Sequence, residues 1–165
     1  QSFGDTQYAH SKMKQWGIIV LISLALCTAC ARGRVYHHYN HTSVIGWERV
    51  DTLLFEIPAL ADSGRYGTDL GLRINGLFPF VSLTLIVEQT VYPAMTHRVD
   101  TINCKLADQN GNFKGQGISY YQYRYHISEM QLQQNDSLHI TVRHDMRREI
   151  LPGISDVGIA LTRRK

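Results

Sequence analysis

The alternation of apolar and polar positions divides this chain into two unlike parts. A mostly apolar run extends from Gly17 to Ala29, behind Lys12-Met13-Lys14 and directly before Cys30. The run is shorter than the roughly 20 residues of a membrane-spanning helix. A charged start, an apolar middle and small residues before a cysteine form the layout of an export signal. We therefore predict a leader and lipoprotein signal peptide over residues 1–29, which is removed, and lipidation of Cys30.

Two other interpretations of this leader stay open. One is an ordinary signal peptide cut near Ala31, and the other is a short uncleaved anchor. Met13 has the surroundings of a natural start residue, so residues 1–12 are left out of the prediction of the fold. In every case residues 1–29 carry no information about the folded domain.

Beyond the leader, apolar residues recur mostly at every second position, which is the period of a β-strand with one buried face. Turn residues such as Asp62-Ser63-Gly64 and Asn75-Gly76 separate the segments. The one stretch with a helical possibility is 145–151, which could form a single turn. The predicted strands cover 52–60, 69–74, 80–91, 98–107, 118–127, 137–143 and 157–161.

Short strands separated by turns, without long helices, are typical of an antiparallel β-sandwich. We predict an all-β, jelly-roll-like sandwich domain over residues 35–165, joined to the lipid by a tether over 30–34. Its core is expected to contain Leu54, Leu72, Leu83, Leu85, Leu106, Leu138, Ile140, Val142 and Val157.

Charge and cysteine content narrow the function classes. The whole chain has 17 Lys and Arg against 14 Asp and Glu, and no basic stripe is interleaved with aromatic residues, so nucleic acid is not an expected partner. The basic run Arg163-Arg164-Lys165 is interpreted as a solvated tail. Beyond Cys30 only Cys104 remains, so the domain has no disulfide framework. Its place in an alternating segment predicts a buried strand position.

Three blocks of the chain, taken together and in order, resemble a known family. They lie at 72–85, 106–117 and 146–158. The first contains Leu72-Arg73-Ile74-Asn75 and Phe78-Pro79-Phe80, and departs from the family pattern at Val81-Ser82. The second reads Leu106-Ala107-Asp108 and then Gly115-Gln116-Gly117, and the third joins Met146-Arg147, Leu151-Pro152-Gly153-Ile154 and Asp156-Val157-Gly158. Behind a lipoprotein signal, they resemble the gliding-motility lipoprotein GldH family of the Bacteroidetes.

The resemblance implies a non-enzymatic envelope lipoprotein, an accessory or assembly component of gliding motility and the linked type IX secretion machinery. It implies no cofactor, and other envelope lipoproteins or secretion and motility components as partners. The lipoprotein signal itself predicts the membrane anchor, a diacylglycerol with palmitate as an acyl chain on the Cys30 thiol. Ala31, rather than aspartate, follows Cys30, which favours the outer membrane, and no acidic run follows to favour surface display. The residues that match the family are interpreted as structural first: Arg73, Asn75, Pro79, Asp108, Gly111, Gly115, Gly117, Met146, Arg147, Gly153, Asp156 and Gly158.

Two of these positions have a specific backbone role in the prediction. Gly153 follows Pro152, a pair suited to a type II turn with glycine at the left-handed position. Asp108 opens a stretch that spaces oxygen ligands like a calcium loop, but Phe113 and Ser119 stand where that loop needs glycine and glutamate. A hairpin turn at Asn110-Gly111 is therefore preferred to a metal site.

The remaining candidate chemistry is weaker. His37-His38-x-x-His41 could chelate a transition metal, but no cysteine or carboxylate accompanies it, so it is interpreted as a solvated segment. No hydrolase motif occurs, and Asp145 and Glu149 are expected to form a salt-bridged turn with the arginines between them. Neither catalytic residues nor a metal site is predicted.

A tyrosine-rich segment supports an alternative function. Tyr121, Tyr123 and Tyr125 share one strand face, while Tyr120 points to the other. With Trp47 they could form an aromatic platform for a glycan, which would make the chain a glycan-binding sandwich module on an envelope lipoprotein. Because one face must serve the core, aromatic packing accounts for much of this pattern.

Overall fold

The computed structural model describes residues 33–165, which form one compact unit. The predicted leader, Cys30 and most of the tether lie outside the described residues. Residues 33–165 contain no helix, and so none that is long and apolar enough to span a membrane. The strands are β1 (Arg34–His41), β2 (Trp47–Glu48), β3 (Leu53–Ile57), β4 (Gly64–Asn75), β5 (Ser82–Tyr92), β6 (Thr96–Lys105), β7 (Tyr120–Leu132), β8 (Ser137–His144), β9 (Ile150–Leu151) and β10 (Ile154–Arg163).

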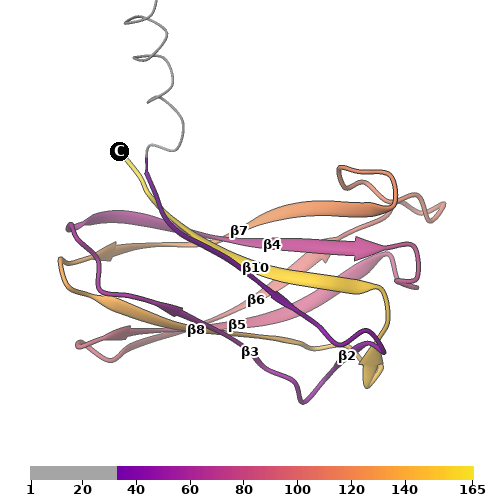
Figure 1. Ribbon diagram of the computed structural model, residues 1–165, viewed down its shortest axis with the longest axis horizontal. Coiled ribbons are helices and arrows are strands. Elements are labelled where there is room, and N and C mark those ends of the chain that lie inside the picture. The colour runs from indigo at the N-terminus through magenta and orange to yellow at the C-terminus, as the bar shows by residue number, and fades with distance from the viewer. Residues whose placement is uncertain (1–32) are drawn as a thin grey trace, which may run out of the picture. The chain divides into compact units, whose positions relative to one another are not determined.

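Two antiparallel sheets face each other (Figure 1). The first sheet has the order β1-β10-β4-β7, the second has the order β3-β8-β5-β6, and the short strands β2 and β9 pair at one end. The chain crosses between the sheets at every connection of the long strands except the β5–β6 hairpin. This is the strand order of a jelly roll, so the predicted fold class is confirmed.

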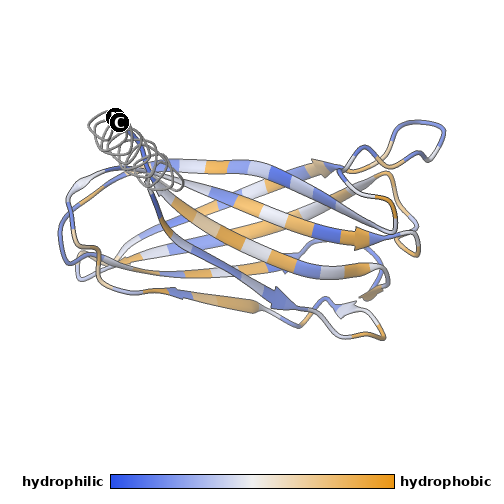
Figure 2. Ribbon diagram, turned by 45° about the horizontal axis from the view of Figure 1, so that its top comes forward, coloured by the Kyte–Doolittle hydropathy of each residue, from blue (hydrophilic) through white to orange (hydrophobic). Residues whose placement is uncertain are grey.

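The core lies between the sheets, and bands of opposite hydropathy alternate along most strands (Figure 2). Of the nine predicted core residues, all but Leu54 are buried. Leu54 is 43% exposed, so that prediction is wrong. Residues 53–55 are all apolar, so the sequence does not show which of them face the core. Pairing with β8 turns Phe55 and Ile57 inward instead of Leu54.

Three local predictions are also corrected. Residues 145–149 form no helical turn and bend at 147–149, because the carbonyl of Glu149 accepts the backbone N–H of Arg49 at 2.8 Å as β9 pairs with β2. The Glu149 carboxylate pairs with Arg49 at 3.6 Å, not with the arginines beside it in sequence. The basic run is not a free tail, because the N–H of Arg163 donates to Gly33 at 2.6 Å and that of Arg164 to Arg65 at 2.7 Å.

Two structural predictions are confirmed. Cys104 is fully buried, and burial raises the pKa of its thiol to about 12, which keeps it protonated and unreactive. Gly153 lies in the turn between β9 and β10 with φ +82°, the left-handed position. Its carbonyl accepts the N–H of Asn75 at 2.8 Å, and a β-carbon at Gly153 would overlap the backbone of Phe78.

Candidate functional site

One residue from each strand of the first sheet contributes to a row across its outer face. Tyr39 of β1 is in register with Gly158 of β10, which is paired with Gly71 of β4, which is paired with Arg124 of β7. Glycine inside a strand lowers its stability, and it often marks a place where another group approaches the backbone closely. Here the ring of Tyr39 takes that space, since a β-carbon on Gly158 would lie 2.6 Å from the ring and one on Gly71 would overlap the hydroxyl.

Charged neighbours hold the Tyr39 ring in this position. The guanidinium carbon of Arg73 lies 4.4 Å from the ring centroid, a cation–π contact. Arg73 is in turn 3.9 Å from the carboxylate of Asp156, which also pairs with His41 and accepts the hydroxyl of Ser155 at 2.7 Å. Asp156 is almost completely buried, so its charge needs these partners.

The loop after β6 approaches this row, and Asp108 shapes it. The Asp108 carboxylate accepts the backbone N–H groups of Asn110 and Asn112, both at 2.9 Å, and pairs with Lys114 at 3.0 Å. These bonds, led by that from the Asn112 backbone, hold the pKa of Asp108 well below its usual range. Gly111 takes a positive φ of 82° in the same turn. The carboxylate therefore caps a turn, as preferred above.

The loop then docks on β7 through two backbone hydrogen bonds between Gln116 and Gln122, at 3.0 and 2.8 Å. Gly115 makes the close approach possible, because a β-carbon there would lie 2.6 Å from the ring of Tyr123. Gly117 has a φ of +129°, which only glycine adopts readily, and its bare α-carbon faces the Tyr120 carbonyl. Both glycines are thus required by the path of this loop.

Three of the four tyrosines of β7 point inward under the loop, and the fourth, Tyr120, is exposed. Tyr121, Tyr123 and Tyr125 share one face, as predicted, and pack against the core. The hydroxyls of Tyr123 and Tyr125 donate to the carbonyls of Leu106 (2.6 Å) and Lys105 (2.8 Å). Trp47 is completely buried. The platform expected from these residues is therefore not an exposed surface, and aromatic packing explains the pattern.

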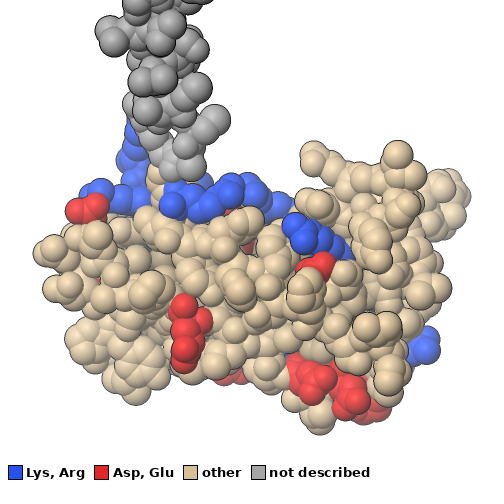
Figure 3. Space-filling model, viewed as in Figure 1, with Lys and Arg blue, Asp and Glu red and all other residues tan. Residues whose placement is uncertain are grey.

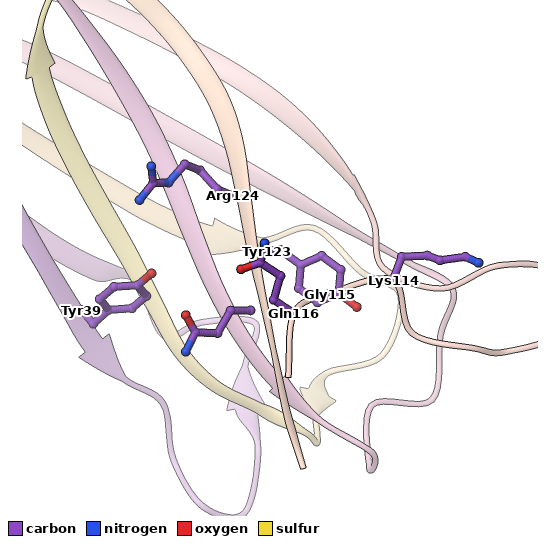
Figure 4. Close-up of a pocket in the computed structure, with 7 residues that line it drawn as sticks. Tyr39, Lys114, Gly115, Gln116, Tyr123 and Arg124 are labelled. Atoms are coloured by element: carbon purple, nitrogen blue, oxygen red, sulfur yellow. The ribbon is translucent and has the colours of Figure 1, made fainter. Parts of the chain in front are cut away.

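The row and the loop together enclose an open pocket of about 560 Å³, which we call the Tyr39 pocket (Figure 4). Arg124 and Tyr39 approach it from opposite sides, whereas Lys114 points away along the loop, toward Asp108. The lining supplies the guanidinium of Arg124, the ammonium of Lys114, two carboxamides and two phenols, all of which can form hydrogen bonds to a ligand. The lining residues are Tyr39, Lys114, Gly115, Gln116, Gln122, Tyr123 and Arg124.

Positive charge dominates this face of the molecule. Within residues 33–165, Arg124 has no ion-pair partner. The pKa of His37, two residues along β1 from Tyr39, is lowered first by burial and then by Arg34, Arg124 and Arg73. Figure 3 shows Lys and Arg side chains gathered along the side of the domain that the first sheet forms. An anion approaching the pocket therefore meets a favourable potential.

The residues that match the family fall into two groups in space. Near the Tyr39 pocket are those that hold Tyr39 or shape the loop, namely Arg73, Asp108, Gly111, Gly115, Gly117, Asp156 and Gly158. The others lie along the β4–β5, β8–β9 and β9–β10 connections, namely Asn75, Pro79, Met146, Arg147 and Gly153. In that group Asn75 caps its turn, and Met146 packs on the core beside the N–H of Thr84.

The histidine segment forms part of β1, which the sequence prediction missed. Tyr39 and His37 form an edge-to-face ring pair, and His41 pairs with Asp156. His38 instead contacts Asn40 and approaches Phe55. Among the described residues, no group of three potential ligands is placed to hold a metal.

Sequence reasoning also missed the residues that line the pocket most directly. Tyr39 lies in the segment that the sequence predicts to be solvated. Gln122 and Arg124 lie between the tyrosines of β7, and the sequence prediction assigned them no role. The two-residue period of a strand could have located them. Gln122, Arg124 and His126 alternate with the inward-facing tyrosines and so occupy the outer face of β7.

Comparison with known proteins identifies the family. Residues 34–161 match the sequence profile of the GldH lipoprotein family. The chain is 27% identical over 160 residues to the gliding motility lipoprotein GldH of Flavobacterium johnsoniae, which covers 93% of this chain and 99% of that protein. Solved structures that match this chain weakly include a 4-O-methyl-alpha-glucuronidase with specificity for decorated arabinogalactans (TM-score 0.43, 12% identity, 82% of this chain and 18% of that one). Another is a protein from Sulfurospirillum deleyianum (TM-score 0.41, 8% identity, 79% and 98%). Scores this low support no functional comparison, but the profile spans most of the chain, and this protein is therefore a member of the GldH lipoprotein family.

Proposed function

We propose that this GldH-family lipoprotein is an accessory component of the gliding-motility machinery and of the type IX secretion system linked to it. It acts without catalysis, is held by a lipid on Cys30 in the outer membrane, and faces the periplasm. The observation that carries the proposal is the family match over residues 34–161. Other envelope lipoproteins or secretion components are its partners.

The structure of the first sheet supports a binding role. An interaction protein needs exposed polar side chains on a rigid scaffold, whereas an enzyme needs converging titratable groups in a pocket. The outer face of the first sheet carries Arg73, Arg124 and Tyr39 on paired strands. The lining of the Tyr39 pocket offers no nucleophile with a neighbouring base.

The anchor is tested by labelling cells with a fatty-acid analogue. Cys30→Ser is expected to abolish labelling of this protein, and Cys27→Ser, in the predicted signal peptide, to leave it unchanged. Labelling that persists in Cys30→Ser would show that another residue carries the lipid, and an unlabelled wild-type protein would contradict lipidation altogether, as an uncleaved leader would require.

The accessory role is tested by deleting the gene and measuring colony spreading and secretion. Loss of both, restored by the wild-type gene, is the expected result. Mild cross-linking followed by purification should then recover envelope lipoproteins or secretion components. Normal spreading and secretion in the deletion strain would refute the proposed role.

A further inference from the structure

We propose that the Tyr39 pocket binds an anionic saccharide, a sugar that carries a carboxylate. The inference goes beyond the proposed role in motility and does not depend on it. It rests on the geometry of the pocket, on the guanidinium of Arg124, which forms no ion pair with any of residues 33–165, and on the amide groups of Gln116 and Gln122.

The anionic part of the ligand follows from Arg124. Its planar guanidinium can donate two parallel hydrogen bonds to a carboxylate. None of the ion pairs within residues 33–165 involves Arg124, since Asp69 pairs with His126 at 3.0 Å, Asp108 with Lys114 at 3.0 Å, and Asp156 with Arg73 at 3.9 Å. Within residues 33–165 the guanidinium of Arg124 is therefore available to a ligand.

The saccharide part follows from size and from the amides. A volume of about 560 Å³ exceeds what a simple anion fills and is within the range of small-molecule sites. Each carboxamide offers donors and an acceptor, which match the paired donor and acceptor character of sugar hydroxyls. The side chains of Gln116 and Gln122 form no hydrogen bond within the described residues, while their backbones are fixed to each other. The Tyr39 hydroxyl adds a further donor and acceptor.

The site is also preorganised. Tyr39 is held by the two glycines beneath it and by Arg73, and the loop is held by the Asp108 turn and by its backbone bonds to β7. A ligand therefore loses little affinity to ordering of the protein on binding. Gly158 and Gly115 are accordingly positioning residues, which act through Tyr39 and the loop.

An acidic peptide is the competing occupant, and the location of the pocket argues against it. Extended peptides gain most of their affinity by adding a strand to an open sheet edge. The Tyr39 pocket lies on the outer face of the first sheet, between Tyr39 on β1 and Arg124 on β7, and the strands between them, β10 and β4, are paired on both sides and have no free edge.

The experiment is a titration of the Cys30→Ser protein, which retains the whole folded domain, with oligogalacturonates and with neutral malto-oligosaccharides of equal length. We expect calorimetric binding of the acidic sugars, weakening with salt, and at least about tenfold weaker binding of the neutral ones. Arg124→Gln should lose about tenfold or more in affinity. Arg143→Gln is the matched control, because it removes an arginine from β8 in the second sheet, and should change nothing.

A second variant separates loss of contact from loss of structure. Tyr39→Phe keeps the ring over the glycines and removes only the hydroxyl, so we expect an unchanged melting temperature and a smaller loss of affinity than in Arg124→Gln. The proposal is overturned by no binding of acidic sugars at millimolar concentration, by equal binding of neutral sugars, or by normal affinity in Arg124→Gln. Arg124-dependent binding of polyglutamate in place of the sugars would also overturn it. None of these results affects the spreading and secretion tests, so the two proposals fail separately.

Discussion

Replacing Gly158 by alanine tests whether Tyr39 is held by the absence of a side chain beneath it. The new β-carbon would lie 2.6 Å from two carbons of the Tyr39 ring, well inside the roughly 3.5–4.0 Å of a carbon contact. The ring has little room to move, since Gly71 and Arg73 confine its hydroxyl end and its face. The substitution therefore forces the ring, or the β1–β10 pair, to shift.

The size of the effect follows from two opposing terms. In an open strand, replacing glycine by alanine gains about 0.5–1 kcal/mol, because the unfolded chain loses less freedom on folding. Overpacking a confined site costs about 1–3 kcal/mol. Gly158→Ala should therefore lower the free energy of unfolding in the wild-type background, and should be neutral or stabilising when Tyr39→Ala has removed the ring. The coupling between the two substitutions should be about 1–3 kcal/mol.

Urea unfolding of the Cys30→Ser protein and the three variants measures this cycle. Trp47 is buried, and it is the one tryptophan in residues 33–165, so its fluorescence reports unfolding of the core. Equal destabilisation by Gly158→Ala in both backgrounds would refute the reasoning, because it would place the cost in the backbone rather than in the contact with Tyr39. A stabilising effect in the wild-type background would refute it as well.

Four further predictions concern the core and its turns. Gly153→Val should destabilise by several kcal/mol, since it combines a φ of +82° with overlap on the backbone of Phe78 in the β4–β5 connection; chemical denaturation and protein level in the envelope measure this. Ile140→Ala should cost about 2–5 kcal/mol in the same unfolding assay, because Ile140 is fully buried. Burial lowers the pKa of His144, so its neutral form stabilises the fold fully above the unfolded value of 6.5, and the melting temperature should fall as the pH drops from about 7.5 to about 5.5. Cys104 should not react with a thiol reagent until the protein unfolds.

Each of these has a result that would contradict it. Unchanged stability in Gly153→Val together with lost spreading would assign that glycine to function instead of to the turn. A loss below about 1 kcal/mol in Ile140→Ala would mean that the site collapses around the smaller side chain. The pH dependence should shrink in His144→Gln and persist in His139→Gln, and equal slopes would remove His144 as its source. Rapid labelling of folded Cys104 would require local opening of β6.

The sequence by itself determined those parts of the fold that depend on local chemistry. Two-residue alternation located β5 and β8 and the inward side of Leu83, Leu85 and Ile140. The Asp108 turn and the left-handed Gly153 could likewise be predicted, because a short carboxylate and a proline–glycine pair impose their geometry on neighbouring residues. The three family blocks added the GldH family, which the sequence profile over residues 34–161 confirms.

Tertiary structure alone decided which strands meet and therefore where the pocket forms. Alternation shows which face of a sheet a residue occupies, but not which residue of another strand lies beside it. The row of Tyr39, Gly158, Gly71 and Arg124 therefore follows only from the register between strands that are far apart in sequence. The position of β1 also could not be predicted without its partner strand. Its residues are mostly polar, and they form an edge strand because β10 supplies backbone hydrogen bonds. The burial of Leu54 was predicted wrongly because a run of three apolar residues does not show which of them face the core. Only the pairing of β3 with β8 decides this. The local pattern of apolar and polar residues determines which side chains of a strand face the core and which face the solvent. The register between distant strands determines which of those side chains lie together in one site.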